Sequence, residues 1–139
     1  MIHPTTGEIE LESRARIGSS LTESQFLSSP LSRGARALVT DVQQGSYRTA
    51  RQLISGHTFR LILRFHHAKL VIVEMVHVDR HSKVSWDEAS DQEEQARKAI
   101  HDAWLLRLLG TPPYAYPWGE ITSENDPQGG YSRIVVRYG

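Results

Sequence analysis

One segment of this sequence carries a strong helical signal, and it restricts the fold more than any other feature. Residues 85–119 read SWDEASDQEEQARKAIHDAWLLRLLGTPPYAYPWG, with two overlapping S-x-x-E boxes that begin at Ser85 and Ser90. Such boxes cap the first backbone N–H groups of a helix, and acidic residues suit its positive end. Gly110 favours a left-handed residue just past the helix, and Pro112 prevents continuation. The segment therefore predicts one long helix that ends near residue 109.

The faces of this predicted helix differ along its length. Ala96, Ile100, Ala103 and Trp104 form an apolar stripe at helical spacing. Leucines then occupy most positions of the last turn, between residues 105 and 109. We therefore expect the stripe to face a sheet and the last turn to be buried nearly all round.

Outside this helix, apolar and polar residues alternate with a period of two, which is typical of half-buried strands. A capping box at residues 22–25 predicts a helical turn or two before Pro30. Arg48 and Arg51 are expected on opposite faces of one strand. Strands are predicted at residues 7–11, 35–42, 47–54, 59–65, 70–78, 120–123 and 132–138. The sum is a single α+β domain over residues 1–139, an antiparallel sheet of about six or seven strands packed against one principal helix in the C-terminal half.

The strand at residues 70–78 reads LVIVEMVHV and is apolar on both faces apart from Glu74 and His77. A strand of this kind is usually central in its sheet and covered by a helix on one face. Since the chain offers one long helix afterwards, we expect that helix to provide the cover. The aromatic residues at positions 114–118 are interpreted as a cap on the core, with an exposed protein interface as the alternative.

Composition excludes several classes of function. Lys+Arg and Asp+Glu are equal at 16 each, which removes a general electrostatic reason to bind nucleic acid or membrane surfaces. The sequence contains no cysteine, so disulfides, thiolate metal sites and cysteine nucleophiles are excluded. Residues 1–16 lack the apolar core of a signal peptide, and the longest apolar run, at residues 70–73, is too short to span a bilayer. We expect a cytoplasmic protein.

Histidines offer the first chemical hypothesis. His77 and His81 have ligand-like spacing, but four residues on a strand separate two side chains by about 13 Å. His101 precedes Asp102, yet adjacent helical positions point about 100° apart, so the carboxylate does not orient the ring. We expect His101 at the core edge, satisfied by a backbone carbonyl. Motifs of hydrolases, zinc proteases and phosphate-binding loops are missing from the sequence, and we predict no enzyme activity, metal or cofactor.

The C-terminal half carries a pattern of specific residues. It comprises Trp86, residues 96–98 (ARK), 101–105 (HDAWL), 109–110 (LG), 112–114 (PPY), 118–121 (WGEI), Ser123, 126–127 (DP) and 134–139 (IVVRYG). This pattern resembles small bacterial immunity proteins that act beside secreted antibacterial toxins. The resemblance implies a protein that binds one cognate toxin domain stoichiometrically and carries no catalytic residues. Blockers of nucleases are often strongly acidic, so the neutral charge favours other classes of toxin.

Two groups of residues are candidate contacts with such a partner. The acidic first turns of the helix suit a basic partner, and the predicted hairpin tip near residue 67 is exposed. The candidate partner-binding residues are Asp87, Glu88, Asp91, Glu94, His67 and Lys69. The alternative class is a small adaptor or secretion chaperone that binds without inhibiting, and a third is an enzyme that uses the histidine-bearing hairpin. The sequence leaves the oligomeric state open.

Overall fold

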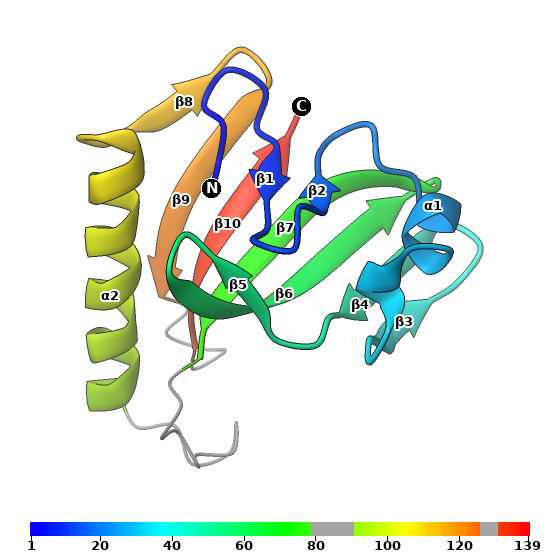
Figure 1. Cartoon of the computed structure of the whole chain (residues 1–139), viewed down its shortest axis with the longest axis horizontal. Helices are drawn as coiled ribbons and strands as arrows, with labels where there is room; N and C mark the ends of the chain where they lie inside the picture. Colours follow the sequence, from blue (N-terminus) through cyan, green and yellow to red (C-terminus); the bar gives the residue numbers. More distant parts are fainter. Residues whose placement is uncertain (79–90, 126–130) are drawn as a thin grey trace.

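The computed structural model describes residues 1–78, 91–125 and 131–139, and it contains one large sheet, one long helix and a smaller N-terminal layer (Figure 1). The strands are β1 (Ile9–Glu10), β2 (Arg16–Ile17), β3 (Arg36–Thr40), β4 (Gln44–Arg48), β5 (Gln52–Ile54), β6 (His57–His66), β7 (Lys69–His77), β8 (Tyr114–Tyr116), β9 (Gly119–Asn125) and β10 (Ser132–Tyr138). The helices are α1 (Glu23–Leu27), the short 3-10 turn η1 (Pro30–Ser32) and α2 (Asp91–Leu109).

Eight strands form the main sheet in the order β3-β4-β6-β7-β10-β9-β8, with β5 also paired to β6. All of these pairings are antiparallel, which confirms the predicted α+β class and the principal helix. β1 and β2 form a separate two-stranded sheet. The described chain thus holds more strands than predicted, because β2 and β8 are too short to show a period in the sequence and the strand predicted over residues 47–54 is divided.

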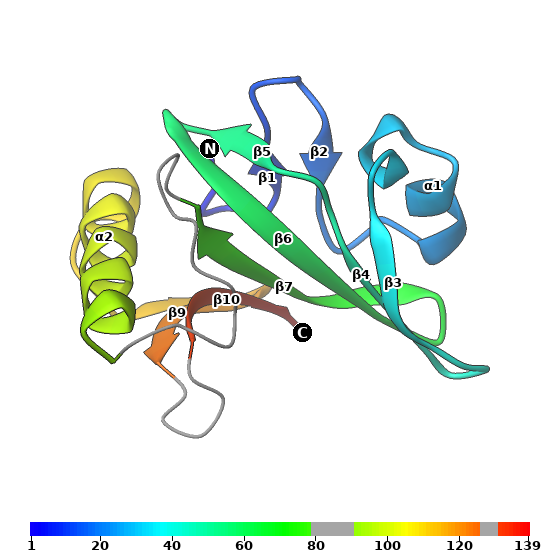
Figure 2. The same cartoon turned by 90° about the horizontal axis from the view of Figure 1, so that it is seen from below.

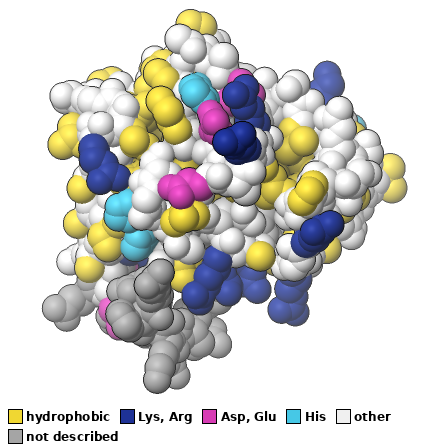
Figure 3. Space-filling view, in the orientation of Figure 1, with side chains coloured by type: hydrophobic (Ala, Val, Ile, Leu, Met, Phe, Trp, Pro, Cys, Tyr) yellow, Lys and Arg dark blue, Asp and Glu magenta, His cyan; other side chains and the backbone are white. Residues whose placement is uncertain are grey.

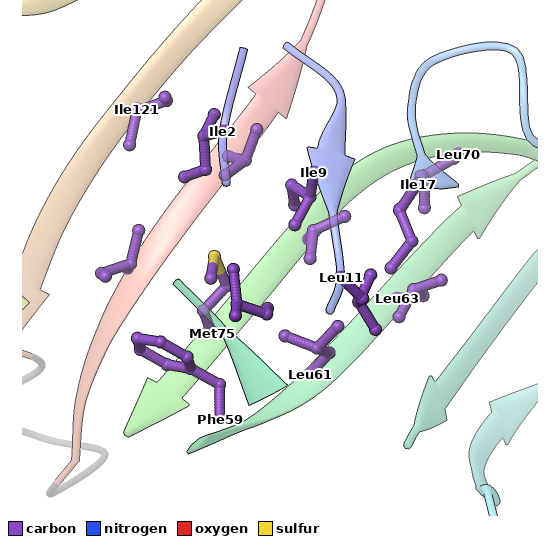
Figure 4. Close-up of a cluster of buried hydrophobic side chains, with 14 of the residues drawn as sticks. Ile2, Ile9, Leu11, Ile17, Phe59, Leu61, Leu63, Leu70, Met75 and Ile121 are labelled. Carbon is purple, nitrogen blue, oxygen red and sulfur yellow. The ribbon is translucent and has the colours of Figure 1, made fainter. Parts of the chain in front are cut away.

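The N-terminal segment covers one face of the main sheet. β7 is central, between β6 and β10, as predicted. Ile2, Ile9 and Ile17 are at most 1% exposed and lie over the side chains of β6, β7 and β10 (Figure 4). Phe26 of α1 continues this layer and packs on Phe65, with ring centroids 5.8 Å apart. The expectation that the long helix provides this cover is therefore wrong for most of the sheet, and β1, β2 and α1 supply it instead (Figure 2).

Helix α2 packs against β9 and β10 at one end of the sheet (Figures 1 and 2). Trp104 of the predicted apolar stripe is buried, but Ala96, Ile100 and Ala103 are exposed. Leu106 is 53% exposed, so the last turn is not buried all round. The predicted faces are wrong because α2 covers only one end of a sheet that other elements already cover, and a single narrow face is enough for that contact.

The strand predicted over residues 47–54 is interrupted in the middle. β4 ends at Arg48, opposite Ile62, and β5 begins at Gln52, opposite Phe59. The chain therefore advances four residues from 48 to 52 while β6 advances three residues between 62 and 59. The extra residue is a β-bulge, which bends a strand and breaks its alternation of faces.

Thr49 holds this bulge in place. Its backbone N–H donates to the carbonyl of Leu61 at 2.8 Å, and its hydroxyl accepts from the Leu61 N–H at 3.3 Å. The same hydroxyl donates to the carbonyl of Ala50 at 2.8 Å. Because the alternation is broken, Arg48 and Arg51, which were predicted to point to opposite faces, line the same hollow.

The aromatic segment after α2 caps the core, as interpreted from the sequence. The hydroxyl of Tyr114 donates to the carbonyl of Gly110 at 2.8 Å, and Gly110 has the left-handed φ of 84° expected just past a helix. Trp118 stacks on Tyr116 and donates from its indole N–H to the carbonyl of Pro4 at 2.7 Å. These contacts join the N-terminal segment to the β8–β9 edge.

Candidate protein-binding surface

The residues predicted to contact a partner do not lie together. Asp87 and Glu88 lie outside the described residues, and Asp91 is the first residue of α2. His67 lies in the turn between β6 and β7, and Lys69 is the first residue of β7. The start of α2 and this turn lie toward opposite ends of the molecule (Figure 1), so the two groups cannot form one continuous surface.

Glu94 is buried inside the fold rather than exposed on an acidic surface. Its side chain is 3% exposed and accepts hydrogen bonds from the backbone N–H of Ser132 and from the guanidinium of Arg97. The hydroxyl of Ser132 also donates to the backbone carbonyl of Glu94 at 2.7 Å. These bonds attach α2 to the start of β10. The carboxylate that we expected to face a partner therefore stabilises the chain itself.

His67 and Lys69 are exposed, and the structure brings them beside a second turn. His67 and Ala68 have φ of 49° and 66°, as a two-residue hairpin turn requires. The N–H of His67 donates to the carbonyl of Gln43 at 2.8 Å and joins this turn to the one between β3 and β4. In that second turn the side chain of Val42 is fully exposed.

β3 forms one edge of the main sheet, and all of its residues are exposed. Leu38 and Val39 are 44% and 49% exposed. Within the described chain, the strand partner of β3 is β4 alone. An open edge presents unpaired N–H and C=O groups to another strand, and exposed aliphatic side chains favour contact with a second protein. We call residues 36–43 together with 67–69 the β3 edge.

A hollow of about 490 Å³ opens at the start of β3, and arginines dominate its walls. We call it the arginine hollow; it is lined by Gly34, Arg36, Arg48, Thr49, Ala50, Arg51 and Arg60. Figure 3 shows the molecule from the side of the N-terminal layer, where Lys and Arg side chains line its lower edge. Burial lowers the pKa of Arg60, and the nearby charges of Arg48 and Arg51 lower it further. The guanidinium groups of Arg48 and Arg51 are therefore close enough to Arg60 to repel it.

The same face of the sheet carries a second arginine cluster whose charges are compensated. Glu74 is 4% exposed and lies between Arg64, at 2.6 Å, and Arg133, at 3.0 Å. Arg137 contacts Glu124 at 2.9 Å. The hydrogen bond from the Thr122 hydroxyl, followed by Arg137, lowers the pKa of Glu124. By contrast, Arg36, Arg48, Arg51 and Arg60 form no ion pair or side-chain hydrogen bond within the described residues.

Three histidines meet where α2 approaches β6 and β7. The Nδ1 of His57 lies 3.1 Å from the Nε2 of His77, and the backbone N–H of His77 donates to the Nε2 of His101 at 3.0 Å. Burial, then the charges of His77 and Arg97, lowers the pKa of His101 to about 3. His101 is therefore a neutral acceptor for a backbone N–H, and not a donor to a carbonyl as expected from the sequence.

This histidine cluster does not amount to a metal site. His81, the second member of the spacing found in the sequence, lies outside the described residues. In the described parts of the chain, no three side chains of metal-binding type lie close enough together to hold an ion. The ring of His101 is also fully buried, so its remaining role is to join α2 to β7.

An apolar groove of about 520 Å³ runs between α2 and the β8–β9 hairpin. Leu105, Leu106 and Tyr114 contribute to its walls, and the ion pair between Lys98 and Asp102, at 2.9 Å, lies at its rim. The half-exposed Leu106 makes this groove a second apolar surface, separate from the β3 edge.

Neither the arginine hollow nor the apolar edge strand is recognisable as a site in the sequence. The arginines of the hollow are dispersed between residues 36 and 60, and no motif links them. The one available signal was their number, since this stretch is rich in arginine while the whole chain is neutral. Only the β3–β4–β6 pairing, with its bulge, brings the four side chains to one place.

Comparisons with protein-family models, with curated proteins and with solved structures found no match to this chain. Among the described residues, no helix combines the length and the apolar character needed to cross a bilayer.

Proposed function

We propose that this protein is an immunity protein that binds a cognate secreted antibacterial toxin domain and inhibits it by forming a stoichiometric complex through the β3 edge. The observation that supports this surface is the exposed edge strand β3 with its aliphatic side chains Leu38, Val39 and, in the adjoining turn, Val42. The resemblance of the C-terminal half to immunity proteins supplies the class of partner.

The β3 edge offers two kinds of contact to a toxin. The unpaired backbone groups of β3 accept an added strand, and such main-chain pairing gives affinity that depends little on side chains. The aliphatic side chains add apolar burial, which contributes about 25 cal/mol for each Å² removed from water. His67 and Lys69, on the neighbouring turn, lie at the rim of this surface, where charged groups mainly set the rate of association. A toxin bound in this way is inhibited when the immunity protein covers the toxin's active site.

Co-expression with the toxin-like product of a neighbouring gene tests the proposal. The wild-type protein should restore growth and co-purify with the toxin in equal amounts. Val39→Lys should weaken the complex at least about tenfold, because it places a charge on the apolar contact. Leu106→Lys is the matched control, since this leucine is exposed to a similar degree but lies in the groove beside α2.

Two results would overturn the proposal in different ways. If the toxin binds tightly but growth is not restored, the protein is an adaptor or secretion chaperone. If Leu106→Lys abolishes the complex while Val39→Lys leaves it intact, the partner binds the groove and the β3 edge is not the contact surface.

A further inference from the structure

The arginine hollow lies beside the open edge of β3, on the face of the sheet away from the N-terminal layer. Arg36 is opposite Arg48 in the β3–β4 register, and Arg48 is opposite Ile62 in the β4–β6 register. Residues directly opposite one another point to the same face of a sheet, and Arg60, two residues before Ile62, shares that face. The β-bulge brings Arg51 to the same hollow. Four guanidinium groups therefore meet next to an unpaired strand edge.

The charge of this cluster is not balanced within the described chain. None of the four arginines contacts a carboxylate there, although the whole sequence has as many acidic as basic residues. Partly buried like charges repel one another, and a bound anion removes that repulsion while it gains charge-assisted hydrogen bonds. Guanidinium groups also match the planar geometry of carboxylates, which they bind through two parallel hydrogen bonds.

We infer that the arginine hollow binds the carboxylates of an extended acidic segment of the partner protein, which adds as a strand along β3. The inference rests on the proposed function and specifies the chemistry of the toxin segment that the β3 edge recognises. Alternate side chains of a strand lie on one face about 7 Å apart. An added strand with acidic residues at every second position would place one carboxylate opposite Arg36 and the next within the hollow.

Two observations favour an acidic polypeptide over a nucleic acid. Proteins that bind single-stranded nucleic acid provide aromatic side chains on which bases stack, and the residues that line the arginine hollow include none. The whole chain is also electrically neutral, so it lacks the long-range attraction for a phosphate backbone. An open strand edge, in contrast, is a feature that only a polypeptide can use fully.

Peptide binding to the purified full-length protein tests the inference directly. The probe is a fluorescein-labelled peptide of about ten residues that alternates threonine and glutamate, and its matched control replaces each glutamate by glutamine. Fluorescence anisotropy should show that the glutamate peptide binds at least about tenfold more tightly than the glutamine peptide. This affinity should fall as NaCl is raised from about 50 to about 300 mM, because salt screens exposed charges.

The double variant Arg48→Gln/Arg60→Gln should lose at least about tenfold of the affinity for the acidic peptide. The double variant Arg14→Gln/Arg16→Gln removes the same charge from the β1–β2 hairpin, outside the hollow, and should bind within about twofold of wild type. Thermal unfolding checks that both variants are folded. Equal binding by wild type and Arg48→Gln/Arg60→Gln would overturn the inference.

Two further measurements separate this inference from other outcomes. Tighter binding of a single-stranded DNA of about 20 nucleotides than of the acidic peptide would show that the hollow is a phosphate site, which also overturns the inference. If the toxin binds Arg48→Gln/Arg60→Gln as tightly as wild type, the immunity function stands and the acidic-segment inference fails. If the toxin does not bind wild type at all but the acidic peptide does, the proposed function fails while the hollow remains a carboxylate site.

Discussion

The two arginine clusters lie on the same face of the sheet, away from the N-terminal layer, and they differ in whether carboxylates balance their charges. In the cluster around Glu74, at the centre of the sheet, each arginine has a carboxylate within contact distance, and the central carboxylate is nearly inaccessible to solvent. In the arginine hollow, beside the β3 edge, four arginines lie together and none has such a contact within the described residues. The sheet, the face and the residue type are the same in both places.

This difference separates charges that stabilise the fold from charges that are available to a ligand. In the first cluster the charged side chains pair with one another inside the fold. Glu94 and His101, where α2 meets β10 and β7, likewise accept hydrogen bonds from backbone N–H groups of the chain. The arginines of the second cluster make no side-chain hydrogen bond or ion pair with any other part of the described chain. Substitutions in the first region should therefore change stability, and substitutions in the second should change binding.

The largest loss of stability is expected for Glu94→Ala. The change removes the acceptor of the Ser132 N–H and leaves the partly buried guanidinium of Arg97 without its carboxylate. Breaking a buried ion pair from one side typically costs about 3 kcal/mol of the free energy of unfolding. Urea denaturation measures this, and Gln95→Ala, at the exposed neighbouring position, should change the same quantity by less than about 0.5 kcal/mol.

Glu74→Ala should lower the free energy of unfolding by about 2 kcal/mol. The expected loss is smaller than for Glu94 because Arg64, one of the two partners, is more than a third exposed and can be solvated when the carboxylate is removed. Glu120 provides the control: it is about half exposed and lies 3.7 Å from Arg137, so Glu120→Ala should cost at most about 0.5 kcal/mol. Similar losses for both variants would contradict the contrast between buried and exposed charges.

Acid should destabilise the protein through His101. Its folded pKa of about 3 lies below the ordinary value of 6.5, so the unfolded chain takes up a proton between these values while the folded chain does not. The stabilisation from neutral His101 is present above pH 6.5 and is lost as the pH falls toward 3. At pH 5.5 the free energy of unfolding should be lower by about 1.4 kcal/mol than at pH 7.5.

The variant His101→Gln isolates this effect from the other histidines. Glutamine retains an acceptor for the His77 N–H but does not titrate, so its stability should depend less on pH by the same amount. Urea denaturation of both proteins at the two pH values gives the comparison. An unchanged pH dependence in His101→Gln would show that another group is responsible.

The smallest effect on stability is expected in the arginine hollow. Arg60→Gln should leave the free energy of unfolding unchanged or raise it by up to about 0.5 kcal/mol, because it relieves repulsion from Arg48 and Arg51. Arg64 lies on the same face of β6, four residues after Arg60. Arg64→Gln should instead lower the free energy of unfolding by about 1 kcal/mol, because the substitution removes a partner of Glu74. A marked loss of stability in Arg60→Gln would contradict the view that the hollow is free for a ligand.

Elements with strong local signals were predictable from the sequence. The capping box at Thr22 is formed as expected, with its hydroxyl accepting from the Gln25 N–H at 3.2 Å. The hairpin of β6 and β7 and the final strand β10 also lie close to the predicted residues. In these segments the alternation and the capping residues agree with the fold, so local chemistry and tertiary packing give the same answer.

The candidate surface was only half predictable. His67 and Lys69 were identified because a polar turn between two apolar strands is exposed in almost any fold. Their neighbour Val42 and the open edge of β3 were not, since a strand at the edge of a sheet has the same alternation as one inside it. Whether a strand is an edge depends on which strands pair with it, and pairing is a non-local property.

The sequence alone determined the fold class of this protein: one principal helix, a set of antiparallel strands and no cysteine chemistry. The capping boxes predicted at Ser85 and Ser90 begin outside the described residues. Tertiary structure decided the positions of the charges. One extra residue after Arg48 places Arg48 and Arg51 in the same hollow. The packing of α2 against β10 buries Glu94, which was expected at the surface. A side chain's accessibility depends on what packs against it from distant parts of the chain, and that information is absent from the local pattern of residues.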